Sequence, residues 1–162
     1  MGKALLRTHL TTPVGILEII GNITHLENIV FCNEPLAHSK DTDRITVFPY
    51  PVLDQINEYF SGDRQTFDLS ITPTGSLFQK KVWSTLQYIP YGKTVSYSDV
   101  AVKIGRPQAV RSVATAIGKN PLPIVIPCHR VVGKNGTLNG YSGGLVNKQL
   151  LLNNEKHRSE NC

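Results

Sequence analysis

The chain has 162 residues, of which 40% are hydrophobic and 18% are charged, and its formal net charge is +5. These values are typical of a globular protein with one domain or two small ones. No apolar run approaches the roughly 20 residues of a membrane span, and the N-terminus lacks a signal-peptide pattern. We therefore expect a soluble, cytoplasmic protein. Its three widely spaced cysteines argue against a disulfide framework and for a reducing compartment.

Charge is divided unevenly along the chain. Residues 1–75 hold 5 Lys/Arg and 9 Asp/Glu, whereas residues 76–162 hold 12 Lys/Arg and 3 Asp/Glu. A strongly basic half is typical of a protein that binds a polyanion, and nucleic acid is the foremost candidate. The alternative is a charged surface that only keeps the protein in solution.

The N-terminal part predicts an antiparallel meander, because short apolar segments alternate with tight turns. Turns are expected at Thr12-Pro13-Val14-Gly15 and at Gly21-Asn22. Strands are expected at residues 5–10, 16–20 and 25–31. A polar segment at 33–47, which contains Pro35, is interpreted mainly as loop.

A helix should follow the meander. Apolar residues between Val52 and Phe60 have helical spacing, and Gly62 is a plausible end. Residues 63–75 are interpreted as a connector between two units. We therefore predict an N-terminal α/β domain over residues 1–73 and a C-terminal domain over 74–162.

The C-terminal part predicts several helices. The first has an apolar face and ends at Pro90-Tyr91-Gly92; the face consists of Phe78, Val82, Leu86 and Ile89. Ser96 and Asp99 have the spacing of a capping box, which would begin a short helix that runs to Ile104 and is closed by Gly105.

A second short helix should come directly after this turn. Pro107 suits its first turn, and Gly118 would end it; its apolar stripe consists of Val110, Val113 and Ile117. Two short helices with a Gly-containing turn match a helix-turn-helix. Arg111 falls off the apolar stripe and should be exposed. The alternative is an ordinary helical hairpin.

Cys128 is the most informative residue of the chain. It lies in Pro127-Cys128-His129-Arg130, directly after the apolar run Ile124-Val125-Ile126. The reactivity of a thiol depends on its thiolate fraction, which a neighbouring histidine and positive charge increase. Prolines should hold the preceding segment, 121–127, in an extended conformation. The alternative is a buried structural thiol.

His129 is the candidate base for this thiol. Successive side chains of an extended segment point to opposite faces, so a bridging water is the expected relay from Cys128. A base needs an orienting partner, and Glu155 lies on the inward stripe of the last predicted helix, near Leu151 and Leu152. The alternative for Glu155 is an exposed position at the helix end. Before that helix, Tyr141-Ser142-Gly143-Gly144 would allow close approach of a ligand to the backbone.

These motifs together resemble one family. They comprise Tyr91-Gly92-Lys93-Thr94-Val95-Ser96-Tyr97, Arg111, Gly118-Lys119-Asn120-Pro121, Ile126-Pro127-Cys128-His129-Arg130-Val131-Val132 and Gly140-Tyr141-Ser142-Gly143-Gly144-Leu145. The chain strongly resembles the O6-alkylguanine-DNA alkyltransferases, also called methylated-DNA–protein-cysteine methyltransferases. The resemblance covers about residues 74–156, while residues 1–73 agree only in their pattern of elements.

The resemblance implies an α/β (α+β) fold. Its N-terminal domain would be a small antiparallel sheet with a helix, similar to ribonuclease H. Its C-terminal domain would be mostly helical and carry a winged-helix or helix-turn-helix unit. The protein would act as a monomer on the minor groove of double-stranded DNA. It would flip O6-alkylguanine out of the stack and transfer the alkyl group irreversibly to Cys128, in a single turnover without cofactor. O4-alkylthymine is a further candidate substrate.

The resemblance also implies roles for individual residues. His129 would deprotonate Cys128 through water, with Glu155 as its orienting acid and Asn120 as a brace of the active-site turn. Tyr97 would rotate the nucleotide and donate to the leaving base, and Arg111 would fill the gap in the duplex. The remaining expected DNA contacts are Ser96, Ala109 and Arg130. The expected pocket for the base consists of Tyr97, Val131, Tyr141, Ser142 and Gly143.

The chain departs from parts of the family. Some members bind zinc in the N-terminal domain, but His9, His25, Cys32 and His38 do not reproduce that spacing, and we expect no metal. We also expect no methylphosphate-sensing domain and no transcriptional role. Two other functions stay open: a non-catalytic lesion-binding protein that signals to excision repair, which the presence of Cys128 disfavours, and a cysteine hydrolase that uses Cys128, His129 and Asn120. Cys32 and Cys162 receive no role.

Overall fold

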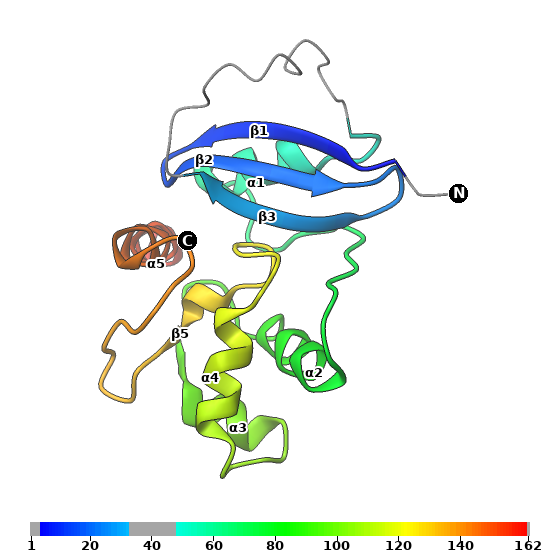
Figure 1. Ribbon diagram of the computed structural model, residues 1–162. Coiled ribbons are helices and arrows are strands. Elements are labelled where there is room, and N and C mark those ends of the chain that lie inside the picture. Colours follow the sequence, from blue (N-terminus) through cyan, green and yellow to red (C-terminus); the bar gives the residue numbers. More distant parts are fainter. Residues whose placement is uncertain (1–3, 33–47, 162) are drawn as a thin grey trace. The chain divides into compact units, whose positions relative to one another are not determined.

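The computed structural model describes residues 4–32 and 48–161 (Figure 1), and the chain divides into two compact units, Met1–Thr72 and Pro73–Cys162. The first unit ends at Thr72, one residue before the domain boundary that the sequence predicts between residues 73 and 74. The loop expected at 33–47, together with His38 and Cys162, lies outside the described residues. In the part of the chain that the structure describes, no helix is long and apolar enough to cross a membrane.

The N-terminal unit is built on a three-stranded antiparallel sheet. The strands are β1 (Leu6–Thr12), β2 (Gly15–Gly21) and β3 (Leu26–Cys32), and β2 lies in the middle. Leu17 and Ile19 of β2, which lie two residues apart and so point to the same face of the sheet, are fully buried. Helix α1 (Val52–Ser61) lies along the sheet in Figure 1 and contributes Ile56 to the core.

The end of α1 follows from one glycine. Gly62 adopts φ 88°, a left-handed conformation that glycine reaches without a Cβ clash. Its N–H donates to the carbonyls of Glu58 and Tyr59. The predicted stop of this helix at Gly62 is confirmed.

The C-terminal unit is mostly helical. It contains α2 (Leu77–Leu86), α3 (Tyr97–Lys103), α4 (Val110–Gly118) and α5 (Leu145–Ser159). A parallel pair, β4 (Val95–Ser96) with β5 (Val131–Val132), and a 3-10 turn η1 (Cys128–Arg130) complete it. The indole N–H of Trp83 in α2 donates to the Ala116 carbonyl in α4 over 2.8 Å. The mixed α/β class, with a small N-terminal sheet and a helical C-terminal unit, is confirmed.

The pair α3 and α4 has the predicted order, with one correction. The capping box is present, since Ser96 Oγ accepts from the Asp99 amide and the Asp99 carboxylate accepts from the Ser96 amide. The position of Pro107 in the first turn of α4 is wrong. Ala109 N–H donates to the Arg106 carbonyl, so Pro107 lies inside a separate turn that the fixed φ of proline favours.

We predict that Ser96→Ala lowers the free energy of unfolding by about 1 kcal/mol, because an N-cap hydroxyl satisfies a free amide of the first turn. Urea unfolding would measure the loss. Ser112→Ala, at an exposed position inside α4, is the control and should stay within about 0.5 kcal/mol of the parent. Equal effects of the two substitutions would contradict the capping role.

Candidate active site

Cys128 begins the tight turn η1 at the end of a folded-back segment. Ile126 N–H donates to the Leu122 carbonyl at 2.8 Å, and Ile124 has φ 75°. The prediction of an extended segment at 121–127 is therefore wrong. The prolines fix only their own φ angles, and Ile124 between them takes the left-handed conformation that reverses the chain.

Asn120 holds this turn from inside. Its Nδ2 donates to the Ile126 carbonyl at 2.9 Å, and its Oδ1 accepts from the Leu122 amide at 2.9 Å. The same side chain lies close enough to the Cys128 thiol to favour its thiolate form. The expected location of Asn120, bracing the active-site turn, agrees with these contacts.

The Cys128 thiol lies in the interior, with 5% of the residue exposed. Burial raises its pKa to about 11, although the Asn120 side chain and the Lys148 charge act in the opposite direction. The expectation that neighbouring groups increase the thiolate fraction of Cys128 is thus corrected, because desolvation outweighs them. The thiol needs a base to take its proton.

A base of suitable geometry lies next to it. His129 is fully buried, and its Nε2 is 2.7 Å from Oε1 of Glu155, which is also fully buried. The predicted pairing of these two residues is confirmed, and the alternative of an exposed Glu155 is excluded. His129 Nδ1 has no hydrogen-bond partner among the described residues, so it is available to a water or to a substrate group.

Electrostatics fixes the protonation of this pair. Burial opposes ionisation of Glu155, but hydrogen bonds and charges from His129 and Arg130 outweigh it and lower the pKa to about 2. Burial likewise lowers the pKa of His129 below its usual value, against the opposing effect of Glu155. At neutral pH Glu155 is therefore charged and His129 neutral. Because a carboxylate only accepts, the imidazole proton is on Nε2 and the lone pair is on Nδ1.

Arg130 belongs to the same cluster. Its Nε and Nη2 donate to the two oxygens of Glu155, each at 2.9 Å, and only 5% of the residue is exposed. The prediction that Arg130 contacts DNA is wrong, because its guanidinium is buried and committed to a carboxylate.

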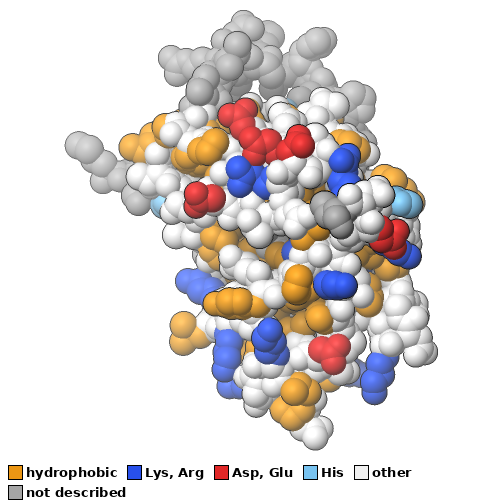
Figure 2. All heavy atoms as spheres, turned by 180° about the vertical axis from the view of Figure 1, so that it is seen from behind, with side chains coloured by type: hydrophobic (Ala, Val, Ile, Leu, Met, Phe, Trp, Pro, Cys, Tyr) orange, Lys and Arg blue, Asp and Glu red, His pale blue; other side chains and the backbone are white. Residues whose placement is uncertain are grey.

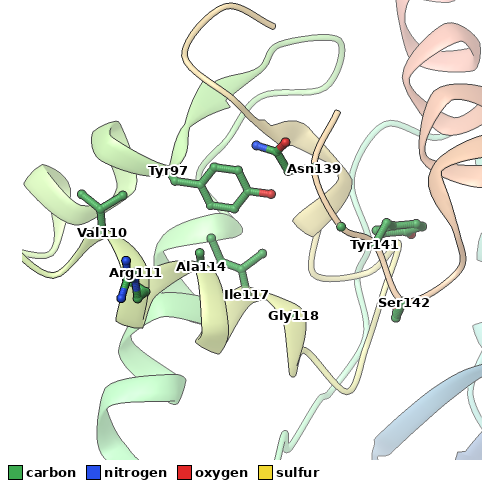
Figure 3. Close-up of a pocket in the computed structure, with 10 residues that line it drawn as sticks. Tyr97, Val110, Arg111, Ala114, Ile117, Gly118, Asn139, Tyr141 and Ser142 are labelled. Atoms are coloured by element: carbon green, nitrogen blue, oxygen red, sulfur yellow. The ribbon is translucent and has the colours of Figure 1, made fainter. Parts of the chain in front are cut away.

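A cavity of about 760 Å³ lies beside α3, α4 and the loop before α5. Of the predicted site residues, Tyr97, Arg111, Tyr141 and Ser142 line it (Figure 3). Val131 and Gly143 are not among its lining residues; Val131 is fully buried in β5. The sequence missed Val110, Ala114, Ile117, Gly118, Asn139 and Gly140.

Tyr97 and Tyr141 line the cavity and are also influenced by the charge of Cys128. Burial raises the pKa of Tyr97 and of Tyr141, and the charge of a Cys128 thiolate raises both further. A thiolate at Cys128 therefore disfavours ionisation of both tyrosine hydroxyls. In Figure 3 the Tyr97 hydroxyl points toward the loop that carries Asn139 and Tyr141.

Lys148 is a buried cation that sequence reasoning missed. Its Nζ donates to the Asn139 carbonyl at 2.9 Å and lies 5.9 Å from the centroid of the Tyr97 ring. Burial lowers its pKa, and the charge of Cys128 opposes that shift. The available signal was helical spacing, since Lys148 precedes Leu151 by three residues and Glu155 by seven, all on one face of α5.

The surface of the C-terminal unit is basic. Most of the charged side chains on the lower part of the face in Figure 2, which this unit forms, are Lys or Arg. Arg111 of α4 is exposed, as predicted. The side chain of Ser96 caps α3, and Ala109 occupies the N-cap position of α4.

Within residues 4–32 and 48–161, no three His, Cys, Asp or Glu residues form a cluster suited to a metal ion.

Comparison with known proteins covers both units. The family described as "6-O-methylguanine DNA methyltransferase, DNA binding domain" matches residues 77–157, and its "ribonuclease-like domain" matches residues 5–73. A "Methylated-DNA--protein-cysteine methyltransferase" of Mycolicibacterium paratuberculosis is 42% identical over 150 residues, 91% of this chain and 90% of that protein. The constitutive protein of that name from Bacillus subtilis is 42% identical over 151 residues, 90% and 92% of the two chains.

Solved structures agree with this result. The crystal structure titled Mycobacterium tuberculosis OGT in complex with DNA has a TM-score of 0.84 and 38% sequence identity. The match covers 94% of this chain and 93% of that one. The similarity therefore extends over nearly the whole chain. It includes the sequence as well as the fold.

We predict that Glu155→Gln lowers the free energy of unfolding at pH 7 by about 3 kcal/mol. The pKa of Glu155 is about 2 in the folded protein, against roughly 4.3 when unfolded, and each unit is worth about 1.4 kcal/mol. A depressed pKa stabilises above pH ~4.3 and the contribution is lost as pH falls toward 2. The two proteins should therefore converge in stability between these values.

Denaturant unfolding across this pH range would measure the difference. Glu58→Gln is the control, because Glu58 also pairs with an arginine, Arg64, but keeps 44% of its side chain exposed. Its loss should stay below about 1 kcal/mol. A Glu155→Gln deficit that persists unchanged at pH 2 would contradict the linkage.

Proposed function

The chain belongs to the 6-O-methylguanine DNA methyltransferase family, and from this premise we propose that it repairs alkylated DNA by direct reversal. An alkyl group would move from O6 of guanine to Sγ of Cys128. The observation that carries the assignment is a buried thiol whose neighbouring imidazole and carboxylate are already hydrogen-bonded. Tyr97 and Tyr141, whose pKa values respond to the Cys128 charge, line a cavity together with the exposed Arg111 of α4.

The first step activates the thiol. The Cys128 proton passes through a water to His129 Nδ1, and the resulting imidazolium keeps its Nε2–H bond to Glu155. Because the carboxylate is ionised throughout, it stabilises the imidazolium without accepting its proton. The cluster then holds a thiolate and an imidazolium where it held two neutral groups.

The second step transfers the alkyl group. The thiolate attacks the sp³ carbon, the S–C bond forms, the C–O6 bond breaks, and the bonding electrons remain on the purine. Hydrogen-bond donors that meet this developing charge stabilise the transition state. Tyr97 and Ser142, which line the cavity, would donate to the base, and backbone carbonyls at Cys128 and Val131 would accept from its amino group. The proton held by His129 balances the charge of the released guanine.

The product explains why each molecule acts once. The S–C bond of the thioether product breaks only if a second nucleophile attacks the alkyl carbon and expels the cysteine thiolate, and the proposed site uses Cys128 as its single acceptor. The protein is therefore both catalyst and substrate, and it is consumed stoichiometrically. Neither step requires a cofactor or a metal ion.

DNA would bind at the helix pair α3 and α4. A duplex encloses O6, so the nucleotide has to leave the stack before the thiol can reach it. Helix α4 lines the cavity and exposes Arg111, which supports a role of this helix in both DNA binding and base extrusion. A monomer would enter the minor groove with α4, Arg111 would occupy the vacated space, and Ser96 and Ala109 would lie near the backbone.

We predict that the protein gains the mass of one methyl group, on Cys128, when it meets duplex DNA containing O6-methylguanine. Cys128→Ser should show no transfer and should still bind the methylated duplex, because only the nucleophile is lost. Mass spectrometry of the intact and digested protein would measure residue and stoichiometry together. Cys32→Ser is the matched control and should react as the parent does.

The same assay separates the other functions. A lesion-binding protein would retain methylated DNA without gaining mass, and a cysteine hydrolase would turn over an ester or peptide repeatedly. Methyl transfer by Cys128→Ser would refute the assignment of the nucleophile.

We predict that Arg111→Ala slows transfer from duplex DNA by about tenfold or more, since extruding a base costs a few kcal/mol that an inserted side chain offsets. Transfer from free O6-methylguanine should change little. Single-turnover rates on the two substrates would measure this difference. Lys119→Ala, which removes an exposed charge just after α4, is the control for a general loss of DNA affinity. Equal losses of Arg111→Ala on both substrates would remove Arg111 from base extrusion.

A further inference from the structure

Each of the three guanidinium nitrogens of Arg130 donates a hydrogen bond to a group in the interior. Nη1 donates to the Ile89 carbonyl at 2.7 Å, while Nε and Nη2 donate to Glu155. Its Cζ also lies 5.6 Å from the centroid of the Tyr91 ring. A planar fork that meets a carboxylate with two donors fixes the orientation of that carboxylate as well as its charge.

Each Glu155 oxygen consequently has two donors. Oε1 accepts from His129 Nε2 and from Arg130 Nη2, and Oε2 accepts from Arg130 Nε and, at 3.2 Å, from the Gly92 amide. The carboxylate cannot rotate without breaking several of these bonds. Oε1 is thereby held toward the imidazole.

We propose that Arg130 is a positioning residue for the alkyl transfer: it holds Glu155 in the orientation that keeps the His129 proton on Nε2, and its charge keeps the imidazole neutral until the thiol proton arrives. This inference rests on the proposed transfer to Cys128. Arg130 touches neither the alkyl group nor the thiol in this role, and it acts through Glu155.

The charges around His129 explain why a permanent cation is needed. The titratable groups that face it are Glu155 and Lys148 from α5 and Arg130 and Cys128 from the turn η1, with Tyr141 near both Glu155 and Cys128. Burial lowers the pKa of His129, Glu155 raises it, and Arg130 and Lys148 lower it again. If Arg130 were neutral, the Glu155 charge would favour imidazolium, and imidazolium has no lone pair for the thiol proton.

Proton transfer is balanced within this cluster. Before it, Glu155 is negative, Arg130 positive, and both His129 and Cys128 are neutral. After it, the imidazolium and the thiolate carry opposite charges, and the sum over the four residues is unchanged. Arg130 offsets the Glu155 charge before and after the transfer, so the four residues together stay neutral in a buried site, where a net charge would be costly.

The test compares Arg130→Met with Arg130→Lys in the full chain. Arg130→Met removes the charge, so the pKa of His129 should rise and the acidic limb of the transfer rate should move to higher pH. Transfer at neutral pH should slow by about tenfold or more, a share of what a general base contributes. Arg130→Lys keeps the charge but loses the fork. It should leave the His129 pKa and the acidic limb in place while slowing transfer at every pH.

NMR titration of the His129 ring without DNA would measure its pKa, and single-turnover methyl transfer would give the pH profile. Arg7→Met, which removes an arginine of β1 that pairs with Glu18 and keeps 57% of its side chain exposed, should match the parent in both. Because the NMR measurement needs no repair activity, failure of the parent to transfer methyl would refute the proposed function and leave the Arg130 test intact.

A second pair of variants covers the case in which Arg130→Met does not fold. Glu155→Gln leaves Arg130 unopposed and should lower the His129 pKa, whereas Arg130→Met combined with Glu155→Gln should raise it again relative to Glu155→Gln alone. Equal His129 pKa values in these two variants would overturn the proposal. So would Arg130→Met and Arg130→Lys proteins that share one His129 pKa, or that both repair at the parental rate.

Discussion

The buried Glu155 carboxylate is the constraint on which the site depends. A charged group in the interior is tolerated only with several partners, and Glu155 of α5 draws its donors from η1 and from the turn at Gly92. Arg130 precedes Glu155 by 25 positions along the chain, and Gly92 precedes it by 63. The one carboxylate therefore sets where the turn that carries Cys128 lies against α5.

Gly92 shows how closely this arrangement is packed. A Cβ at this position would lie 2.8 Å from Ser159 Oγ, and the residue has φ 75°, so both space and backbone require glycine. Its amide can then approach Glu155 Oε2. A residue remote from the thiol in sequence thus contributes to the chemistry by letting two backbones come close.

Features that depend on neighbouring residues could be predicted from the sequence. Tertiary contacts between segments that are far apart in the sequence could not. The Ser96–Asp99 capping box and the stop at Gly62 depend on residues a few positions apart, so the pattern contains the whole interaction. Glu155 was predicted because helical spacing placed it inward. Arg130 was misjudged because a basic residue in a basic half suggests the surface, and only its contacts with Glu155 and the Ile89 carbonyl make it internal. The left-handed Ile124, which reverses the segment 121–127, carries no signal in its side chain.

The two buried cations of the site, Arg130 and Lys148, differ in whether a carboxylate neutralises their charge. Arg130 has a carboxylate on its fork, so its charge is neutralised within the cluster. Lys148 instead donates to the neutral Asn139 carbonyl and lies over the Tyr97 ring, so its charge remains effective toward the cavity. The attraction between Lys148 and a Cys128 thiolate acts against the burial of the thiol. With Arg130 paired to a carboxylate and Lys148 donating to a neutral carbonyl, the site keeps the imidazole neutral and favours negative charge at the sulfur, the combination that a buried thiol nucleophile requires.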